Sequence, residues 1–502
     1  MLHYTRVVIY NTSISTTKPM RILLIWIWWF GMSALARLFF VLWYTVIWVN
    51  DVVNNNTLAL QKLWIKIYIW HGQCEVLFKD IVIYSDIESI KQWPELQQSY
   101  ALSKQHDPKR YHTQFSYNQF LAEISKRFIT ISTSWSNGKS TVTSMLGHSV
   151  STLFPDRFGM CIVWAIVPDW WETNCLISTQ NKPQLQQIFD KMLTWKWDLD
   201  YDLVKKFFFV VEACEYKDHF LLLDTDWSCI TNIHRDHTDY FLSEKQYAES
   251  FVAFINKTRY QSYVGPQALE EMQKYNYTEP DLLPVVVQNT HHFAYAHIFG
   301  TIQQTNGNLV HTVCTWVQQK YYNTESTLAI TQAIQTSPTL SRRCELLGTS
   351  TWWALVFSDY WHHAPAIAFG IEALGQKYPD KQLHIVFQPH QVKRLFAWRQ
   401  EFADVLYKYK NTQIYCIYSA RESRETTKNS EWFTQIFAKS PTPPTNENEI
   451  WEAFAHTIQW RFLANKQQLS LYVDALDTKD IICIFSAWDL DSDMREILVS
   501  PD

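Results

Sequence analysis

The residues with the clearest chemical potential lie where a β-branched segment runs into a lysine-containing loop. Residues 128–133 predict a strand, and a helical pattern begins a few residues later. Backbone N–H groups at a strand-to-helix junction bind phosphate oxygens, and the helix dipole favours the negative charge. We therefore predict a nucleotide-phosphate site, the alternative being a chance match in an ordinary turn. Its residues are Asn137, Gly138, Lys139, Ser140 and Thr141.

Each residue type in this loop suits a different part of a nucleotide. Lys139 would neutralise the β- and γ-phosphates, and the Ser140 hydroxyl would coordinate Mg²⁺. A glycine is usual earlier in such loops, but Trp135 stands in that place. An indole there would occupy space that the backbone needs to approach the phosphates.

Acidic and imidazole side chains follow two further predicted strands. Segment 207–211 precedes Glu212 and Glu215, and segment 228–233 precedes a second polar group. Ligands bind at the carboxyl ends of strands in open α/β sheets, which makes both groups candidates for a shared site. Taken singly, each side chain is better explained as a solvated loop charge. The second group contains His234, Asp236, His237 and Asp239.

The last third of the chain holds a pair of arginines and a pair of histidines. Arg342 and Arg343 precede a predicted strand at 354–357, and Asp359, His362 and His363 follow it. A guanidinium can contact a phosphoryl group through two hydrogen bonds, and a carboxylate or imidazole can accept a proton from an amine. The alternative for the histidine pair is a surface loop.

The segment 22–49 has two interpretations. Arg37 is its only charged residue, so its length and hydropathy fit a membrane span. If glycine is placed at each tryptophan, the same segment becomes a strand, a glycine-rich turn, a helix and a second strand, followed by Asp51. That order is the βαβ unit of dinucleotide-binding type, and we favour it.

Bulk properties bound the remaining possibilities. A chain of 502 residues suggests about three domains. The net charge of −5 and the lack of a long Lys/Arg run argue against a nucleic-acid partner or an anionic membrane surface. Nine scattered cysteines without CxxC spacing predict free thiols in a reducing cytoplasm rather than disulfides or zinc sites.

Several of these segments, taken in order, resemble the Mur ligase family, and most closely its alanine-adding branch. The family's glycine-rich opening ends in Gly-Met-Ser-Ala-Leu-Ala, which stands unchanged at 31–36. VVEACEY at 210–216 and TNIHRDHTDY at 231–240 resemble its VVEADEY and TNIxxDHLDY motifs. Arg-Arg-Cys-Glu at 342–345 and the Asp359 loop resemble two later motifs, so the resemblance covers residues 20–500 with one internal deletion.

This resemblance implies a three-domain α/β fold. Its parts would be a Rossmann-like UDP-sugar-binding domain at 20–125, a central ATP-binding parallel sheet at 126–338 and a Rossmann-like amino-acid-binding domain at 339–502. Residues 1–19 would be an extension, either disordered or not part of the native chain. The implied activity joins L-alanine to UDP-N-acetylmuramate in peptidoglycan synthesis, using ATP and Mg²⁺ through an acyl-phosphate. The alternatives are a sister ligase that attaches a whole peptide, and an inactive or membrane-anchored protein.

The resemblance also assigns roles to the candidate residues. Ser140, Glu212 and His237 would hold Mg²⁺. Asn323 would contact the adenine, and the segment 330–340 that follows its motif is shorter than in the family. Arg343 would contact the transferring phosphate. Asp359 with His362 or His363 would orient the amine or take its proton. A cytoplasmic location follows from the family, whereas amino acid preference and oligomeric state do not follow from the sequence.

Glycine is scarce here, and tryptophan often stands in its place. The chain has 11 glycines and 24 tryptophans, and the two together make about 7% of the residues, an ordinary glycine content. A left-handed non-glycine residue costs about 1–2 kcal/mol, so twelve would consume most of a typical stability of about 5–15 kcal/mol. Our hypothesis is that these tryptophans are UGA codons that the source organism reads as glycine; a decayed or artificial sequence is the rival. The twelve tryptophans at family glycine or small-residue positions are Trp26, Trp28, Trp29, Trp43, Trp48, Trp64, Trp70, Trp135, Trp164, Trp353, Trp361 and Trp488.

Overall fold

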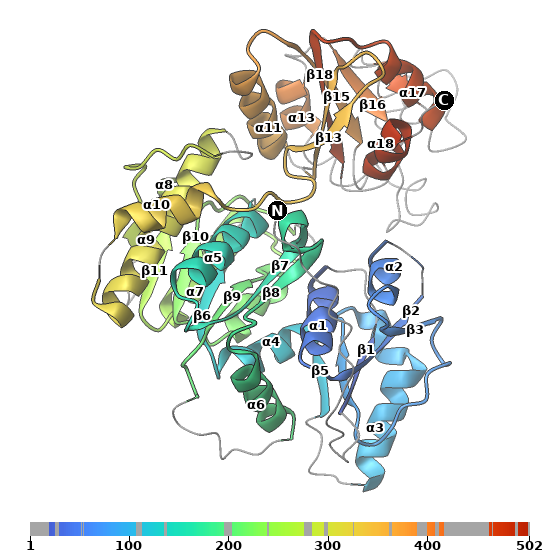
Figure 1. Ribbon diagram of the computed structural model, residues 1–502, viewed down its shortest axis with the longest axis vertical. Coiled ribbons are helices and arrows are strands. Elements are labelled where there is room, and N and C mark those ends of the chain that lie inside the picture. Colours follow the sequence, from blue (N-terminus) through green and yellow to red (C-terminus); the bar gives the residue numbers. More distant parts are fainter. Residues whose placement is uncertain are drawn as a thin grey trace. The chain divides into compact units, whose positions relative to one another are not determined.

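The computed structural model contains three β-sheets with helices on their faces (Figure 1). The chain divides into two compact units, one of residues 1–131, 155–164 and 173–226 and the other of the remainder. The domain boundaries expected at 125/126 and 338/339 stay predictions. The structure describes residues 20–25, 30–51, 53, 55–106, 113–134, 138–194, 203–237, 240–275, 284–295, 300–324, 326–360, 364–388, 399–406, 411–415, 461–463, 465–486 and 490–499.

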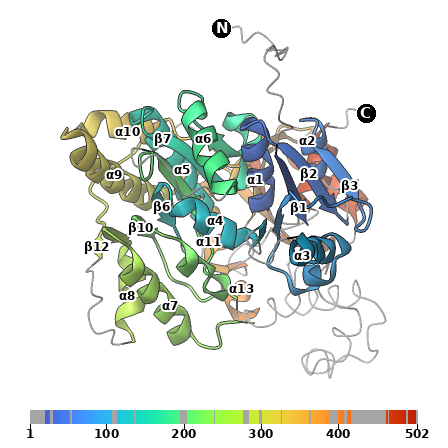
Figure 2. The same ribbon diagram turned by 90° about the horizontal axis from the view of Figure 1, so that it is seen from below.

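The first sheet has five parallel strands in the order β3-β2-β1-β4-β5. The apolar β1 is buried on both faces, because α1 covers one face and α3 the other (Figure 2). Gly31 is needed in α1, since a Cβ there would lie 2.4 Å from the Tyr117 hydroxyl. The elements are β1 (Arg21–Ile25), α1 (Phe30–Val41), β2 (Thr45–Asn50), α2 (Asn55–Gln61), β3 (Lys66–Ile69), β4 (Ile81–Tyr84), η1 (Glu88–Gln92), α3 (Pro94–His106) and β5 (Gln114–Ser116).

The membrane-span interpretation of segment 22–49 is wrong. Its described residues form β1, α1 and β2, and the 12 residues of α1 measure about 18 Å, short of a hydrocarbon core of about 30 Å. Throughout the described part of the chain, no helix has the length and apolar character that crossing a bilayer requires. The same apolar run suits a membrane helix or parallel strands covered on both faces, and the strand pairing decides between them.

The second sheet has seven strands in the order β12-β11-β10-β6-β9-β7-β8. Three strands expected from the sequence at 128–133, 207–211 and 228–233 are present as β6, β9 and β10, with bounds that differ by up to three residues. The strands are β6 (Ile129–Thr133), β7 (Phe158–Val167), β8 (Thr173–Ile177), β9 (Phe208–Glu212), β10 (Trp227–Ile230), β11 (Gln261–Val264) and β12 (Val285–Val286). The helices between and after them are α4 (Tyr117–Ser125), α5 (Lys139–Leu153), η3 (Pro168–Trp170), α6 (Lys182–Leu193), η4 (Tyr216–Leu222), α7 (Glu244–Lys257), α8 (Pro266–Gln273), α9 (Thr301–Tyr322) and α10 (Thr327–Gln335).

The third sheet has six strands in the order β13-β14-β18-β15-β16-β17. Its strands are parallel except at one edge, where β13 and β14 form an antiparallel hairpin, because a short turn joins them and leaves no room for a crossover helix. The elements are β13 (Glu345–Thr349), β14 (Leu355–Asp359), α11 (Ala364–Lys377), β15 (Gln382–Gln388), α13 (Arg399–Leu406), β16 (Thr412–Tyr415), β17 (Arg461–Leu463), α17 (Lys466–Asp474), β18 (Asp480–Ser486) and α18 (Leu490–Val499).

Two glycines allow a test of packing in the second and third sheets. A Cβ at Gly265, where β11 leads into α8, would lie 2.4 Å from the backbone oxygen of Thr231, so Gly265→Ala should destabilise the chain by about 1–3 kcal/mol. Gly375 lies on an exposed turn of α11 with no atom within 4 Å of such a Cβ, so Gly375→Ala should stabilise by about 0.5–1 kcal/mol. Denaturant unfolding of both variants checks the opposite signs. Equal effects would contradict the backbone geometry described here.

Candidate active site

The lysine loop sits where β6 turns into α5. Gly138 is the N-cap of α5 and has φ of 92°, a left-handed conformation that side chains disfavour. Its carbonyl accepts hydrogen bonds from the N–H groups of Thr141 and Val142 at 2.9 and 3.2 Å, which start the helix. The helix N-terminus formed in this way, at Lys139 and Ser140, is the kind of arrangement that binds anions. The predicted contact Asn137 lies outside the described residues.

Hydroxyl groups fix the first turn of α5 against the end of β6. The Thr143 hydroxyl donates to the Lys139 carbonyl at 2.7 Å and also pairs with the Thr133 hydroxyl. The backbone N–H of Ser134 donates to the Cys229 carbonyl at 2.9 Å, which links the end of β6 to β10. Because Ser140 and Thr141 are both buried, this turn is held in place before any ligand binds.

The histidine loop follows β10, the strand next to β6. His237 has φ of 52°, and its carbonyl accepts hydrogen bonds from Tyr240 and Phe241 at 2.9 Å each. The guanidinium of Arg235 donates to the Phe241 carbonyl at 2.8 and 3.1 Å, and Asp236 accepts from the His237 N–H at 2.7 Å. The loop is thus closed on itself. Of the other members of this predicted group, Asp239 lies outside the described residues.

Glu212 ends β9, which lies on the other side of β6 in the strand order. The carboxylate is almost fully buried and accepts a hydrogen bond of 2.9 Å from the Trp164 backbone N–H. Glu212 belongs to the first compact unit, whereas Lys139 and His237 belong to the second. Their convergence on one triphosphate therefore stays a prediction.

Two of the three predicted magnesium ligands offer the donor atom that Mg²⁺ prefers. Ser140 and Glu212 offer oxygen atoms, which Mg²⁺ prefers, while His237 offers nitrogen. Among the described residues no group of three His, Cys, Asp or Glu side chains could hold a metal ion. Mg²⁺ in nucleotide enzymes keeps several waters and binds one or two carboxylates together with substrate phosphates, so a sparse donor set suits it.

A charged network joins the segment 342–345 to the third sheet. The guanidinium of Arg342 lies 3.6 Å from the Asp491 carboxylate and donates to the Ser486 carbonyl, while its N–H donates to Glu345 at 2.7 Å. Arg495 contacts both Asp491 and Glu345, at 2.9 and 2.6 Å. Arg342 is therefore tied into the fold at several points.

Arg343 and Asp359 lie near each other at the end of β14. The guanidinium of Arg343 is 5.4 Å from the centre of the Tyr360 ring. Asp359 is buried, and its Oδ2 accepts hydrogen bonds from the Cys344 thiol at 3.0 Å and the Cys344 N–H at 3.2 Å. Burial raises the pKa of Asp359 to about 6, although the Arg343 charge and the Cys344 bonds lower it. A carboxyl with this pKa can exchange a proton near neutral pH.

The remaining predicted site residues are the adenine contact Asn323 and the histidine pair after β14. Asn323 is exposed and ends α9 in the left-handed conformation with φ of 48°, a position where asparagine is common for structural reasons. Its adenine contact stays a prediction. His362 and His363 lie outside the described residues.

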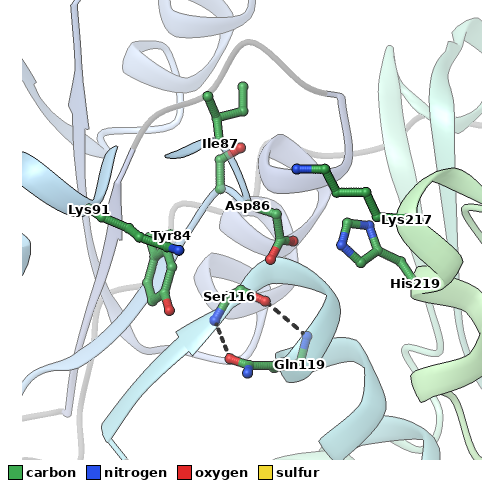
Figure 3. Close-up of a pocket in the computed structure, with 9 residues that line it drawn as sticks. Tyr84, Asp86, Ile87, Lys91, Ser116, Gln119, Lys217 and His219 are labelled. Carbon is green, nitrogen blue, oxygen red and sulfur yellow. Dashed lines mark hydrogen bonds between the residues drawn. The ribbon is translucent and has the colours of Figure 1, made fainter. Parts of the chain in front are cut away.

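The structure shows a pocket that the sequence analysis missed (Figure 3). It has a volume of about 300 Å³ and lies at the carboxyl ends of β4 and β5. Lys217 and His219 enter it from η4, a few residues after Glu215, which is the one sequence signal that could have found it. Two lysines, one histidine and several hydroxyls in a small space suit an anionic ligand. The lining residues are Tyr84, Ser85, Asp86, Ile87, Lys91, Ser116, Gln119, Lys217 and His219.

Hydrogen bonds hold the floor of this pocket. Ser116 caps α4, its hydroxyl accepting from the Gln119 N–H while the Gln119 side chain accepts from the Ser116 N–H (Figure 3). The Asp86 carboxylate accepts from the Asn118 side chain at 2.6 Å. Lys217 has φ of 53°, so its backbone is constrained where the side chain enters. These hydrogen bonds connect the loop after β4 to the start of α4.

Three sheets flanked by helices place the chain in the multidomain α/β class, in which a glycine-lysine loop at a strand-to-helix turn commonly binds nucleotide phosphates. The family model for the Mur ligase middle domain matches residues 135–321. UDP-N-acetylmuramate–L-alanine ligase of Lactobacillus acidophilus is 26% identical over 332 residues, which is 61% of this chain and 66% of that enzyme, just under two thirds of its length.

Solved structures agree on the fold. UDP-N-acetylmuramate–alanine ligase of Thermotoga maritima matches with a TM-score of 0.66 at 16% identity, over 95% of this chain and 98% of that one. A murein peptide ligase of Psychrobacter arcticus matches with a TM-score of 0.56 at 17% identity, over 95% of this chain and 98% of that ligase. Residues 135–321 thus match the Mur ligase middle domain, and the chain is similar to alanine-adding members of that family. The expected three-domain α/β fold is confirmed.

The raised pKa of Asp359 predicts how stability depends on pH. Its pKa exceeds the ordinary value of 3.8, so the native state holds the proton more tightly and loses stability as pH rises from about 4 to about 6. Asp359→Asn should therefore stabilise the chain at pH 7, on the order of 2 kcal/mol, and the gain should vanish below pH 4. Unfolding by urea across this pH range measures the effect.

Asp491 gives a control of opposite sign. Burial raises the pKa of its carboxyl, but the Arg342 charge and hydrogen bonds from Arg495 and Ser358 outweigh burial and lower it. Asp491→Asn should destabilise at pH 7, with a smaller effect in acid. A loss of stability at pH 7 in both variants would show that burial of the ionised Asp359 carboxylate does not destabilise the native state.

Proposed function

We propose that this chain is an ATP-dependent ligase that joins L-alanine to UDP-N-acetylmuramate in peptidoglycan precursor synthesis. The observation that carries the proposal is the left-handed Gly138, which starts α5 at Lys139 a few residues after the end of β6, the strand next to β10. A triphosphate is the ligand that such a turn suits best. The alanine-adding relatives supply the substrate class by resemblance.

The reaction would proceed in two steps on the substrate carboxylate. ATP phosphorylates the carboxylate to an acyl-phosphate, and the L-alanine amine then displaces phosphate to form the amide. Lys139 and Arg343 stabilise charge on the transferring phosphoryl group. Asp359, whose pKa burial raises to about 6, orients the ammonium or takes its proton, together with His362 or His363.

The remaining site residues would hold the nucleotide and its ion. Bound Mg²⁺ would supply charge neutralisation between the phosphates, with Ser140, Glu212 and His237 as its protein ligands. Asn137 and Thr141 would contact phosphates, and Asn323 would contact the adenine. The donor types at Ser140 and Glu212 support the ion, as oxygen ligands do for Mg²⁺ generally.

The pocket of Lys91, Lys217 and His219 is our proposed site for the charged part of the UDP-sugar. It lies within the predicted UDP-sugar-binding domain except for η4, and its positive side chains complement a diphosphate or a carboxylate. The central range 126–338 would bind ATP, and the range 339–502 would bind alanine. A cytoplasmic location and roles in cell shape and division follow from peptidoglycan synthesis itself.

A sister activity is the second candidate. The murein peptide ligase of Psychrobacter arcticus shares the fold, so a tripeptide could replace L-alanine as the amine. The unchanged Gly-Met-Ser-Ala-Leu-Ala sequence at 31–36 favours the alanine-adding branch. An inactive chain is the third outcome that an assay can return.

Amine-dependent phosphate release tests the activity and the role of Lys139. With UDP-N-acetylmuramate and ATP, alanine should release phosphate faster than serine, glycine or a tripeptide. Lys139→Met should lower kcat by about a hundredfold or more, because a preorganised charge on the phosphoryl group is lost. Lys245→Met, at an exposed lysine on α7, is the control and should leave the rate unchanged. A tripeptide preference would identify the sister ligase, and no release with any amine would refute the proposal.

The pocket assignment predicts a separation of two Michaelis constants. Lys217→Ala should raise KM for UDP-N-acetylmuramate about tenfold, since one charge-assisted hydrogen bond is lost, and leave KM for ATP unchanged. Lys104→Ala, at an exposed position on α3, is the matched control. An equal rise in both constants would place Lys217 in the nucleotide site or in the fold's stability instead.

A further inference from the structure

Two helices of the first unit end in the same way, with tryptophan at the position that requires a left-handed residue. At the end of α1, the Trp43 N–H donates to Phe40 at 3.1 Å and the Tyr44 N–H to Phe39 at 3.0 Å. At the end of α2, the Trp64 N–H donates to Gln61 at 2.9 Å and the Ile65 N–H to Leu60 at 3.3 Å. Both patterns are Schellman motifs, whose left-handed residue is usually glycine.

A third tryptophan takes the corresponding position in a hairpin. The Trp353 N–H donates to the Ser350 carbonyl at 3.0 Å in the turn between β13 and β14, and Trp353 has φ of 68°. A turn followed by one left-handed residue is the usual three-residue hairpin loop, with glycine at that residue. The neighbouring Trp352 is 62% exposed, close to the 69% of Trp353, but does not have positive φ.

Two further tryptophans with positive φ directly follow a short helix and a strand. Trp171 ends the 3-10 helix η3 with φ of 57°, its N–H bonded to Pro168. Trp70 follows β3 with φ of 82°, its N–H donating to Asn50 at 2.7 Å. Trp171 was not among the tryptophans singled out by resemblance, so the backbone identifies it independently.

Tryptophan is an unsuitable residue for all five places. Asn, Asp and His are the residues enriched at positive φ, whereas five of the thirteen non-glycine cases in the described residues are Trp. The five indoles are between 60% and 93% exposed, so packing gives them little in return for the strained backbone. The exception is Trp43, where the Lys182 ammonium lies 4.2 Å from the ring, and an exposed cation–π contact is weak.

We infer that the polypeptide made by the source organism carries glycine at positions 43, 64, 70, 171 and 353. The tryptophans there would be UGA codons that the organism decodes as glycine. Glycine satisfies every backbone hydrogen bond described above, because these bonds involve only N–H and C=O groups. Trp170 and Trp352 carry no such requirement, and the inference does not include them.

Peptide masses decide the residue identities directly. Protein isolated from cells of the source organism should give peptides with glycine at these five positions. Tryptophan found at any of the five would overturn the inference for that position. Because this measurement needs no variant, it does not depend on the folding of the recombinant chain or on its ligase activity.

Thermal unfolding of the recombinant full-length chain tests the physical reason. Trp64→Gly and Trp353→Gly should each raise the melting temperature by about 2 °C or more, since the left-handed strain is removed. Their matched controls are Trp352→Gly, exposed beside Trp353, and Trp170→Gly, buried beside Trp171. The first control should not raise the melting temperature and the second should lower it. A rise in the controls, or none in the test pair, would contradict the inference.

Discussion

A chain that leaves a parallel strand and immediately starts a helix beside a phosphate must reverse its backbone within a few residues. Gly138 does this with φ of 92°, and α5 begins at the next residue. Everything proposed about ATP depends on this turn, since it starts α5 a few residues after the end of β6 and so creates a helix N-terminus that can bind an anion. The Thr133–Thr143 contact and the bond from Ser134 to Cys229 hold it in place.

The same left-handed requirement recurs across the molecule, and the residues that meet it differ in character. Asparagine and aspartate, as at Asn323 and Asp218, are residue types that often adopt left-handed φ and ψ. His237 lies in a loop that its own backbone hydrogen bonds close. Strain at a candidate ligand loop such as that of His237 fits a functional position. Strain at the exposed tryptophans, none of which is a candidate site residue, has no such reason, which is why we interpret them as glycines.

The third sheet combines rigid charge pairing with one electrostatically unfavourable group. Arg342, Arg495, Asp491 and Glu345 neutralise one another, so they anchor the segment that enters the sheet. Asp359 is buried beside them with only partial compensation from Arg343 and Cys344. Two carboxylates in one domain thus have pKa values moved in opposite directions, a separation that often accompanies acid–base function.

The order of strands and helices was readable from the sequence because local patterns specify it. The βαβ at the start, the strands before Lys139, Glu212 and His237, and the family motifs all followed from apolar runs bounded by polar loops. Local patterns could not say whether the run at 22–49 spans a membrane, that β13 pairs antiparallel, or that Lys217 and His219 line a pocket with Lys91. Those outcomes depend on which strands pair and on side chains far apart in the chain, so only the tertiary structure decided them.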